Sequence, residues 1–217
     1  MRIQLITMPR SGSTYFYRAI NRYTYGYLCD DDVGWGEFFS PWKMRASDNY
    51  ETDKANRLKI WNSASDMFIK THMHYLDDAE VLEACRSSDI YNILLYRRDI
   101  FQAALSLSIT EYTGEHVLYT QDTGFDIKQA DLEKSIDFYI GYLEKLNSNY
   151  YKLDFAEVFA FEDLTFNEDT DFHSTLLSDK FIRKVKKSPD KKRITNYNEL
   201  YEFSSKYLNG KTTWDFK

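Results

Sequence analysis

Ile90–Tyr96 is the segment that most constrains the fold of this chain, because it is the clearest strand in the sequence. Its residues, IYNILLY, form an apolar run that is typical of a central strand in a parallel sheet. Ile3–Met8 and Met67–Ile69 are shorter apolar runs that also predict strands, whereas Ala130–Asn147 has the 3.6-residue apolar period of a helix. Strands that alternate with helices predict an α/β fold: a three-layer arrangement with a central, mostly parallel sheet flanked by helices.

The remaining segments continue this alternation. We expect a fourth strand within Tyr151–Phe161 and helices at Asp53–Ser63, Asp77–Arg86, Ile100–Glu111, Asp171–Lys187 and Asn198–Leu208. Thr113–Lys128 is a predicted loop. Tyr25–Tyr50 is irregular, and its aromatic residues predict either a lid over an acceptor or a hydrophobic patch beneath a loop. Only three prolines and eight glycines occur among 217 residues, so we predict one compact domain over residues 1–217.

Three of the expected strands are followed by polar or charged residues. The sequences at these ends are PRSGST, KTHMH and RRD, in chain order. In open parallel sheets, ligands bind in the crevice at the carboxyl ends of the strands. The three sequences therefore predict one shared site.

The first of these sequences predicts a loop that binds a phosphate. A strand, a tight turn and a helix together direct free backbone N–H groups at an anion. Gly12 lets the backbone come close, and Arg10 adds a fixed positive charge. The loop is not of the ATP-binding type, because Ser13 stands where that pattern has lysine and Thr7 where it has its first glycine. The alternative is a helix that one of the serines simply caps.

Arg98 and Ser106 are a second candidate pair for an anion. Ser106 lies eight residues after Arg98, in the predicted helix Ile100–Glu111, so its hydroxyl can return to the strand end that carries the arginine. A guanidinium fork and a hydroxyl are suited to a phosphate dianion. The alternative is that Arg97 and Arg98 are surface charges or pair with carboxylates.

Composition limits the classes of partner. The net charge of −6 argues against general nucleic-acid binding, which requires a basic surface. Cys29 and Cys85 form neither a disulfide framework nor a metal-binding spacing, and Asp30–Asp32 is better explained as a solvated loop than as a metal site. We find no signal peptide and no apolar run long enough to span a membrane, and therefore expect a cytoplasmic protein without metal.

Taken in order, PRSGST, KTH and YRRDIFQAALS resemble three signature segments of the sulfotransferases that use 3′-phosphoadenosine 5′-phosphosulfate (PAPS). The first resembles the family's 5′-phosphosulfate loop, and the third resembles its 3′-phosphate segment. Phe161-Glu162-Asp163-Leu164 resembles the family's segment near the adenine, with phenylalanine in place of tyrosine. The cofactor-binding residues that this resemblance implies are Arg10, Ser11, Gly12, Ser13, Thr14, Tyr15, Arg98, Ser106 and Phe161.

The middle segment implies the catalytic residues. It carries the catalytic histidine of the family's cytosolic branch, so His72 is the expected base, with His74 in reserve. Arg10 and Lys70 are expected to stabilise the charge that develops on the bridging oxygen during sulfuryl transfer. The cytosolic R-K-G segment over the 3′-phosphate is missing. In its length and in the segment RRDIFQAALSLS, the chain more closely resembles the compact bacterial and carbohydrate-type members of the family. Some of those members use a carboxylate as the base.

The resemblance implies a P-loop-NTPase-like sulfotransferase fold and the transfer of a sulfuryl group from PAPS to an acceptor hydroxyl, with 3′,5′-bisphosphoadenosine as the product. The acceptor is left open among sugars, lipid hydroxyls, small alcohols and peptide tyrosines, and so is the oligomeric state. Two alternatives remain at this stage. One is a P-loop-type kinase, which would require Mg²⁺, and the other is a non-catalytic nucleotide-binding module.

Overall fold

The computed structural model describes residues 1–13, 16–17, 37–40, 50–113, 124, 126–148, 150–166, 194–211 and 216. The expected helix Asp171–Lys187 lies outside these residues, as do Thr14, Tyr15, Cys29, Asp30–Asp32 and most of the two expected loops.

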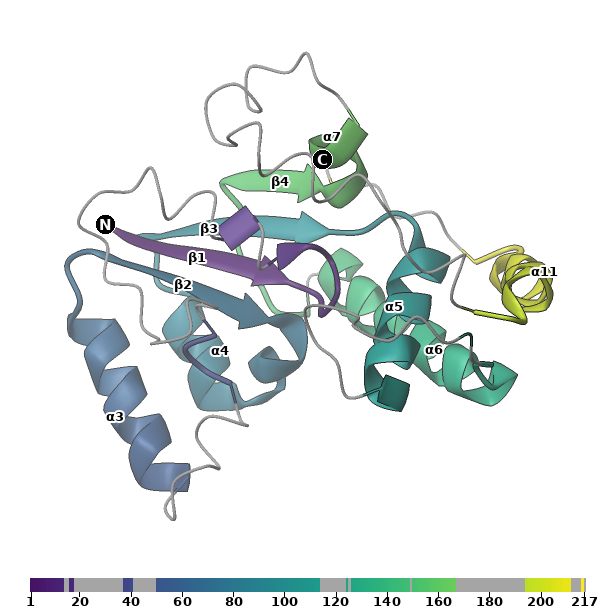
Figure 1. The fold of residues 1–217 in the computed structure, drawn as a ribbon. Helices are drawn as coiled ribbons and strands as arrows, with labels where there is room; N and C mark the ends of the chain where they lie inside the picture. Colours follow the sequence, from purple (N-terminus) through teal and green to yellow (C-terminus); the bar gives the residue numbers. More distant parts are fainter. Residues whose placement is uncertain are drawn as a thin grey trace.

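The described strands form one parallel sheet, as the sequence predicts. β1 (Arg2–Thr7) lies between β2 (Met67–His72) and β3 (Ile90–Tyr96), and β4 (Glu157–Ala160) pairs with the other side of β3. The sheet order is therefore β2-β1-β3-β4, which places the Ile90–Tyr96 strand inside the sheet (Figure 1). β2 extends three residues beyond its apolar run, whereas β4 is shorter than the predicted strand Tyr151–Phe161: it begins only at Glu157, and it ends at Ala160 because Phe161 begins helix α7 (Phe161–Phe166).

Helices connect and cover these strands. The helices of the described residues, besides α7, are α3 (Tyr50–Ser63), the 3₁₀ helix η1 (Met73–Asp77), α4 (Ala79–Cys85), α5 (Ile100–Thr113), α6 (Gln129–Asn147) and α11 (Tyr197–Leu208). The predicted start of the helix Asp77–Arg86 is therefore wrong, since α4 begins at Ala79. Its true beginning is set by Asp78, whose carboxylate accepts hydrogen bonds from the backbone N–H groups of Glu80 and Val81 and so caps α4.

Apolar side chains lie on both faces of the sheet, because successive strand residues point in opposite directions. On one face, Ile3 and Leu5 of β1 pack with Phe16 and Tyr17, which are helical. Ile6 belongs to the larger cluster on the other face, which includes Trp61 of α3 and buried residues of α4, α5 and α6. Figure 1 shows α3 and α4 on the same side of the sheet. The described sheet is therefore flanked on both faces.

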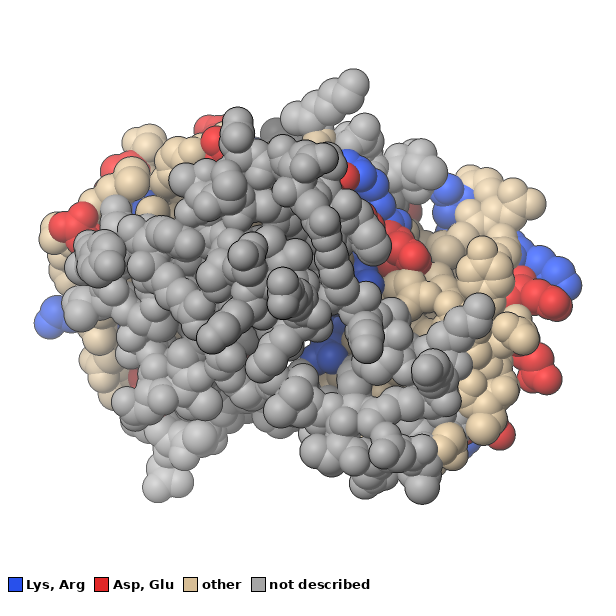
Figure 2. All heavy atoms as spheres, turned by 45° about the horizontal axis from the view of Figure 1, so that its top comes forward, with Lys and Arg blue, Asp and Glu red and all other residues tan. Residues whose placement is uncertain are grey.

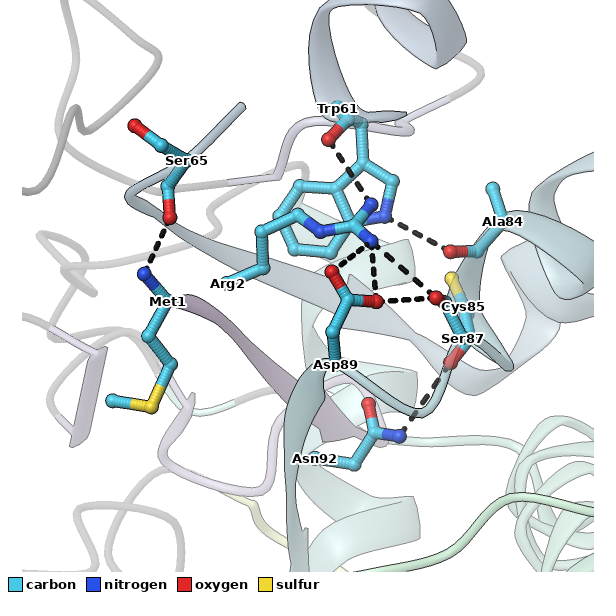
Figure 3. A network of polar contacts seen from close by, with 9 residues as sticks. All are labelled: Met1, Arg2, Trp61, Ser65, Ala84, Cys85, Ser87, Asp89 and Asn92. Carbon is cyan, nitrogen blue, oxygen red and sulfur yellow. Dashed lines mark hydrogen bonds and ion pairs between the residues drawn. The ribbon is translucent and has the colours of Figure 1, made fainter. Parts of the chain in front are cut away.

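A polar network fixes the amino ends of the strands (Figure 3). Arg2 begins β1, and its Nη2 atom lies 2.6 and 2.7 Å from the two carboxylate oxygens of Asp89. Its guanidinium also lies over the ring of Trp61, whose Nε1 donates a hydrogen bond to the carbonyl of Ala84. This network joins α3 and α4 to the starts of β1 and β3, at the end of the sheet opposite the candidate residues.

Among the described helices, none combines the length and the apolar character needed to cross a membrane.

Candidate functional site

The strand register brings the candidate residues to one edge of the sheet. Thr7, the last residue of β1, is paired with His72 of β2 and with Leu95 of β3. Tyr96 of β3 is paired with Ala160 of β4. The residues that follow the four strands therefore meet at the carboxyl edge, toward which the strand arrows point in Figure 1.

The turn after β1 is tight and internally bonded. Arg10 and Gly12 both have left-handed backbone conformations, with φ of 61° and 78°. Ser11 is fully buried, and its hydroxyl donates to the carbonyl of Met8 at 2.7 Å, so this side chain holds the turn together. A left-handed arginine is uncommon because of its Cβ, and such strain is concentrated at functional sites.

Phe161 supports the turn from the β4 side. A Cβ atom placed on Gly12 would lie 2.1 Å from Cε2 of Phe161, so the ring is packed directly against the glycine. The guanidinium of Arg97 lies 4.9 Å from the centre of the same ring, and its Nη1 donates to the carbonyl of Arg10 at 3.3 Å. The resemblance implied that Phe161 lies near the adenine, and the structure places it against the predicted phosphate loop.

Gly12→Ala is expected to lower the free energy of unfolding by about 2 kcal/mol or more. The new methyl group adds strain at a positive φ and collides with the Phe161 ring. Gly141→Ala in α6 is the matched control, because a Cβ there meets nothing within 4 Å. The control is expected to gain about 1 kcal/mol from its higher helix propensity. Urea unfolding of both variants measures the difference, and equal stability of the two would contradict the packing of Phe161 on Gly12.

Arg10 and Ser106 are brought together by the fold. The Nε atom of Arg10 donates a hydrogen bond to Oγ of Ser106 at 3.1 Å, and Ser106 is buried in α5. The sequence predicted that Ser106 lies near the strand end that carries Arg98. In the structure, the hydroxyl joins α5 to the turn after β1.

Arg98 forms an ion pair with α7. Its Nη1 and Nη2 atoms lie 2.7 and 2.6 Å from the two carboxylate oxygens of Asp163. The carboxylate of Glu162 accepts hydrogen bonds from the backbone N–H groups of Arg98 and Asp99, at 3.0 and 3.1 Å. For Arg98, this contact matches the alternative from the sequence in which the two arginines pair with carboxylates.

Lys70 and His72 share a carboxylate that the sequence did not reveal. Oε1 of Glu37 lies 2.9 Å from Nζ of Lys70 and 3.1 Å from Nε2 of His72. The Lys70 side chain is 1% exposed and that of Glu37 is 17% exposed, so this is a buried ion pair. Tyr75 donates from its hydroxyl to the other oxygen of Glu37 at 3.4 Å.

Two features position Glu37. It forms an isolated parallel bridge with Lys70, and the next residues, Phe38 and Phe39, are buried in the larger core cluster. These two phenylalanines are therefore residues of the main core, whereas the sequence predicted either a lid or a hydrophobic patch beneath a loop. The only sequence signal for Glu37 is a single carboxylate beside an apolar pair, and that pattern is too common to single it out.

The charges at this cluster set the protonation of His72. Burial disfavours the carboxylate of Glu37, but its bond to His72 and the charge of Lys70 outweigh this effect and hold its pKa well below 4.5. Burial lowers the pKa of His72 below 6.5, and Lys70 adds to this, so the ring is neutral at pH 7.

A neutral His72 beside an ionised Glu37 has a defined tautomer. The carboxylate only accepts hydrogen bonds, so Nε2 of His72 carries the proton and Nδ1 carries the lone pair. Nδ1 is buried and has no partner of good hydrogen-bond geometry among the described residues, although a backbone contact to Thr7 favours the protonated ring. His72 thus has a basic nitrogen and a carboxylate that would stabilise its protonated form.

His74 has a different environment. Its ring is stacked on that of His72, with ring centres 5.6 Å apart, and burial lowers its pKa to about 4. Hydrogen bonds and ion pairs to a carboxylate are found for His72 and not for His74 among the described residues. Of these two histidines, His72 is therefore the one that a carboxylate orients.

The described surface carries both signs of charge (Figure 2). On the face shown in Figure 2, acidic and basic side chains of the described residues lie side by side and do not form a broad basic patch. Among these residues, no group of three His, Cys, Asp or Glu side chains is arranged to hold a metal ion. The basic side chains near the strand ends are Arg10, Lys70, Arg97 and Arg98, and three of them pair with the carboxylates of Glu37, Glu162 and Asp163.

No protein-family model matches this chain, and a search of curated proteins finds no match.

Proposed function

We propose that this chain is a sulfotransferase with a P-loop-NTPase-like fold, which transfers a sulfuryl group from PAPS to an acceptor hydroxyl and releases 3′,5′-bisphosphoadenosine. The observation that carries the proposal is the buried Lys70–Glu37–His72 cluster, which lies at the same sheet edge as the Arg10 turn. The resemblance of three sequence segments to PAPS-dependent sulfotransferases supports it. The acceptor class is a sugar, a small alcohol or a tyrosine.

The residues present fit the two phosphate groups of PAPS. The turn after β1 contains two left-handed residues, and turns of this kind direct backbone N–H groups at an anion. Arg10 adds a guanidinium there, and Arg98 with the N-terminus of α5 offers a second cationic position. PAPS supplies a sulfuryl group attached to a phosphate leaving group.

Proton removal from the acceptor is assigned to His72. Its ring is neutral, and Glu37 both orients the ring and stabilises the imidazolium once a proton arrives. Arg10 and Lys70 are the cations that would stabilise negative charge on the leaving oxygen. Lys70 is well suited because it is buried, where electrostatic interactions are stronger than in water.

Calorimetric titration with 3′,5′-bisphosphoadenosine tests the proposed function. We expect micromolar binding by the wild type and about tenfold weaker binding by Arg98→Ala, since a charge-assisted contact to phosphate is lost. Lys134→Ala is the control, because it removes one exposed positive charge from α6. Equal affinity of Arg98→Ala and wild type would contradict the assignment, and tighter binding of ATP with Mg²⁺ would favour a kinase.

A further inference from the structure

The ion pair between Arg98 and Asp163 occupies the position at which a phosphate is expected. The two side chains meet through two parallel contacts of 2.7 and 2.6 Å, the geometry in which an arginine fork also binds a phosphate. Both side chains are accessible, with exposed fractions of 45% and 59%. A ligand can therefore reach Arg98, whose guanidinium is already paired with Asp163.

Glu162 completes this arrangement from the same helix. Its carboxylate accepts hydrogen bonds from the backbone N–H groups of Arg98 and Asp99, just before α5 begins, and it lies 3.6 Å from Nε of Arg97. Its side chain is 22% exposed, less than half the exposed fraction of Asp163. The start of α7 thus places two carboxylates at the turn between β3 and α5: Glu162 binds its backbone N–H groups, and Asp163 binds the Arg98 guanidinium that a phosphate would bind.

We propose that Asp163 is an internal competitor for the 3′-phosphate: its carboxylate pairs with Arg98 in the free protein and is displaced when the nucleotide binds. This inference rests on the proposed function. Exposed ion pairs contribute little to stability, so a phosphate dianion displaces the carboxylate at small cost. Glu162, with its two backbone N–H bonds, stays in place and braces the turn.

The competition acts on release as well as on binding. When the nucleotide begins to leave, Asp163 is already beside Arg98 and replaces the departing phosphate, so the guanidinium is never left without a counter-charge. Interactions of this kind weaken a ligand mainly by raising its dissociation rate. Asp163 would therefore accelerate the loss of the product 3′,5′-bisphosphoadenosine.

Asp163→Asn tests the proposal, because it keeps the shape of the side chain and removes its charge. We expect 3′,5′-bisphosphoadenosine and 3′-AMP to bind about threefold more tightly, the order of magnitude of an exposed ion pair. Part of this gain should appear as a lower dissociation rate of 3′,5′-bisphosphoadenosine. The affinity for 5′-AMP, which has no 3′-phosphate, should not change. Asp154→Asn is the control, because it removes one charge from an exposed residue outside α7.

Unchanged or weaker binding of the 3′-phosphate ligands by Asp163→Asn would overturn the proposal, since a residue that only orients Arg98 would weaken binding when it is lost. Inorganic phosphate separates this outcome from failure of the proposed function. If no adenosine nucleotide binds any variant, the sulfotransferase proposal fails. In that case, a larger rise in melting temperature with phosphate for Asp163→Asn than for wild type supports the competitor, and equal rises overturn it.

Discussion

Glu37→Gln is expected to lower the free energy of unfolding by about 3 kcal/mol at pH 7. The substitution keeps the size of the side chain but removes the carboxylate that lies 2.9 Å from the ammonium of Lys70. Lys70 is almost fully buried, and loss of one partner of a buried pair costs about 3–5 kcal/mol because the remaining charge has lost its compensation. The lower end applies because glutamine retains a hydrogen-bond acceptor. Urea unfolding of the variant and the wild type measures this loss.

A double-mutant cycle with Lys70→Met separates charge from packing. Methionine approximates the length of lysine without its charge, so Glu37→Gln with Lys70→Met leaves no uncompensated charge at this position. The double variant should recover part of the stability that Glu37→Gln alone loses. A loss below about 1 kcal/mol for Glu37→Gln would be typical of an exposed ion pair and would contradict the buried cluster.

The same variant has a defined pH dependence. The pKa of Glu37 in the folded protein lies below its ordinary value of 4.5, so the ionised carboxylate stabilises the fold above pH 4.5. This stabilisation decreases as the pH falls below 4.5 toward the folded pKa. The difference in stability between wild type and Glu37→Gln should therefore be largest near neutral pH and become smaller in acid.

His72→Ala is expected to reduce sulfuryl transfer by about 10²–10⁴-fold, the usual contribution of a general base. Binding of 3′,5′-bisphosphoadenosine should be retained, because the phosphate contacts are assigned to Arg10, Arg98 and the turn after β1. Release of 3′,5′-bisphosphoadenosine from PAPS, assayed with sugar, alcohol and phenol acceptors, measures the loss. His74→Ala is the comparison, since the two rings are stacked and only His72 is bonded to Glu37 among the described residues.

The pH profile distinguishes a base from a residue that only packs. His72 must be neutral to accept a proton, and its pKa lies below 6.5, so the wild-type rate should fall in acid below that value. This decrease in rate at low pH should be absent from His72→Ala. If His72→Ala kept both the wild-type rate and its decrease at low pH, the base would be Glu37 or His74 and not His72.

The sheet could be predicted from the sequence, because buried parallel strands are continuous apolar runs. Ile90–Tyr96 matches β3 from its first residue to its last. The apolar run of β2 ends at Ile69, yet the strand continues to His72, because the charge of Lys70 is compensated by Glu37 and tolerated inside the sheet. Such compensation comes from a residue distant in the chain and leaves no local pattern.

Part of the candidate site could also be predicted, because the residues concerned lie at the ends of predicted parallel strands. Arg10, Lys70, His72 and Arg98 stand at strand ends, and parallel strands bring such ends together whatever the connecting segments do. The partners of these residues depend on tertiary contacts. Glu37 comes from a segment with no regular periodicity. The sequence showed the acidic residues of α7 only as part of a motif, without their contacts to Arg98.

The sheet order also determines when the site can exist during synthesis. β1 is synthesised before the other three described strands, yet it occupies an inner position, and its two partners begin only at Met67 and Ile90. The last described part of the site, the start of α7, follows β4, so synthesis must pass Ala160 before all four strand ends are present. Every pairing in the sheet is non-local, which favours slow folding. Occupancy of the site would therefore report that the sheet is complete, and no early fragment of the chain would contain it.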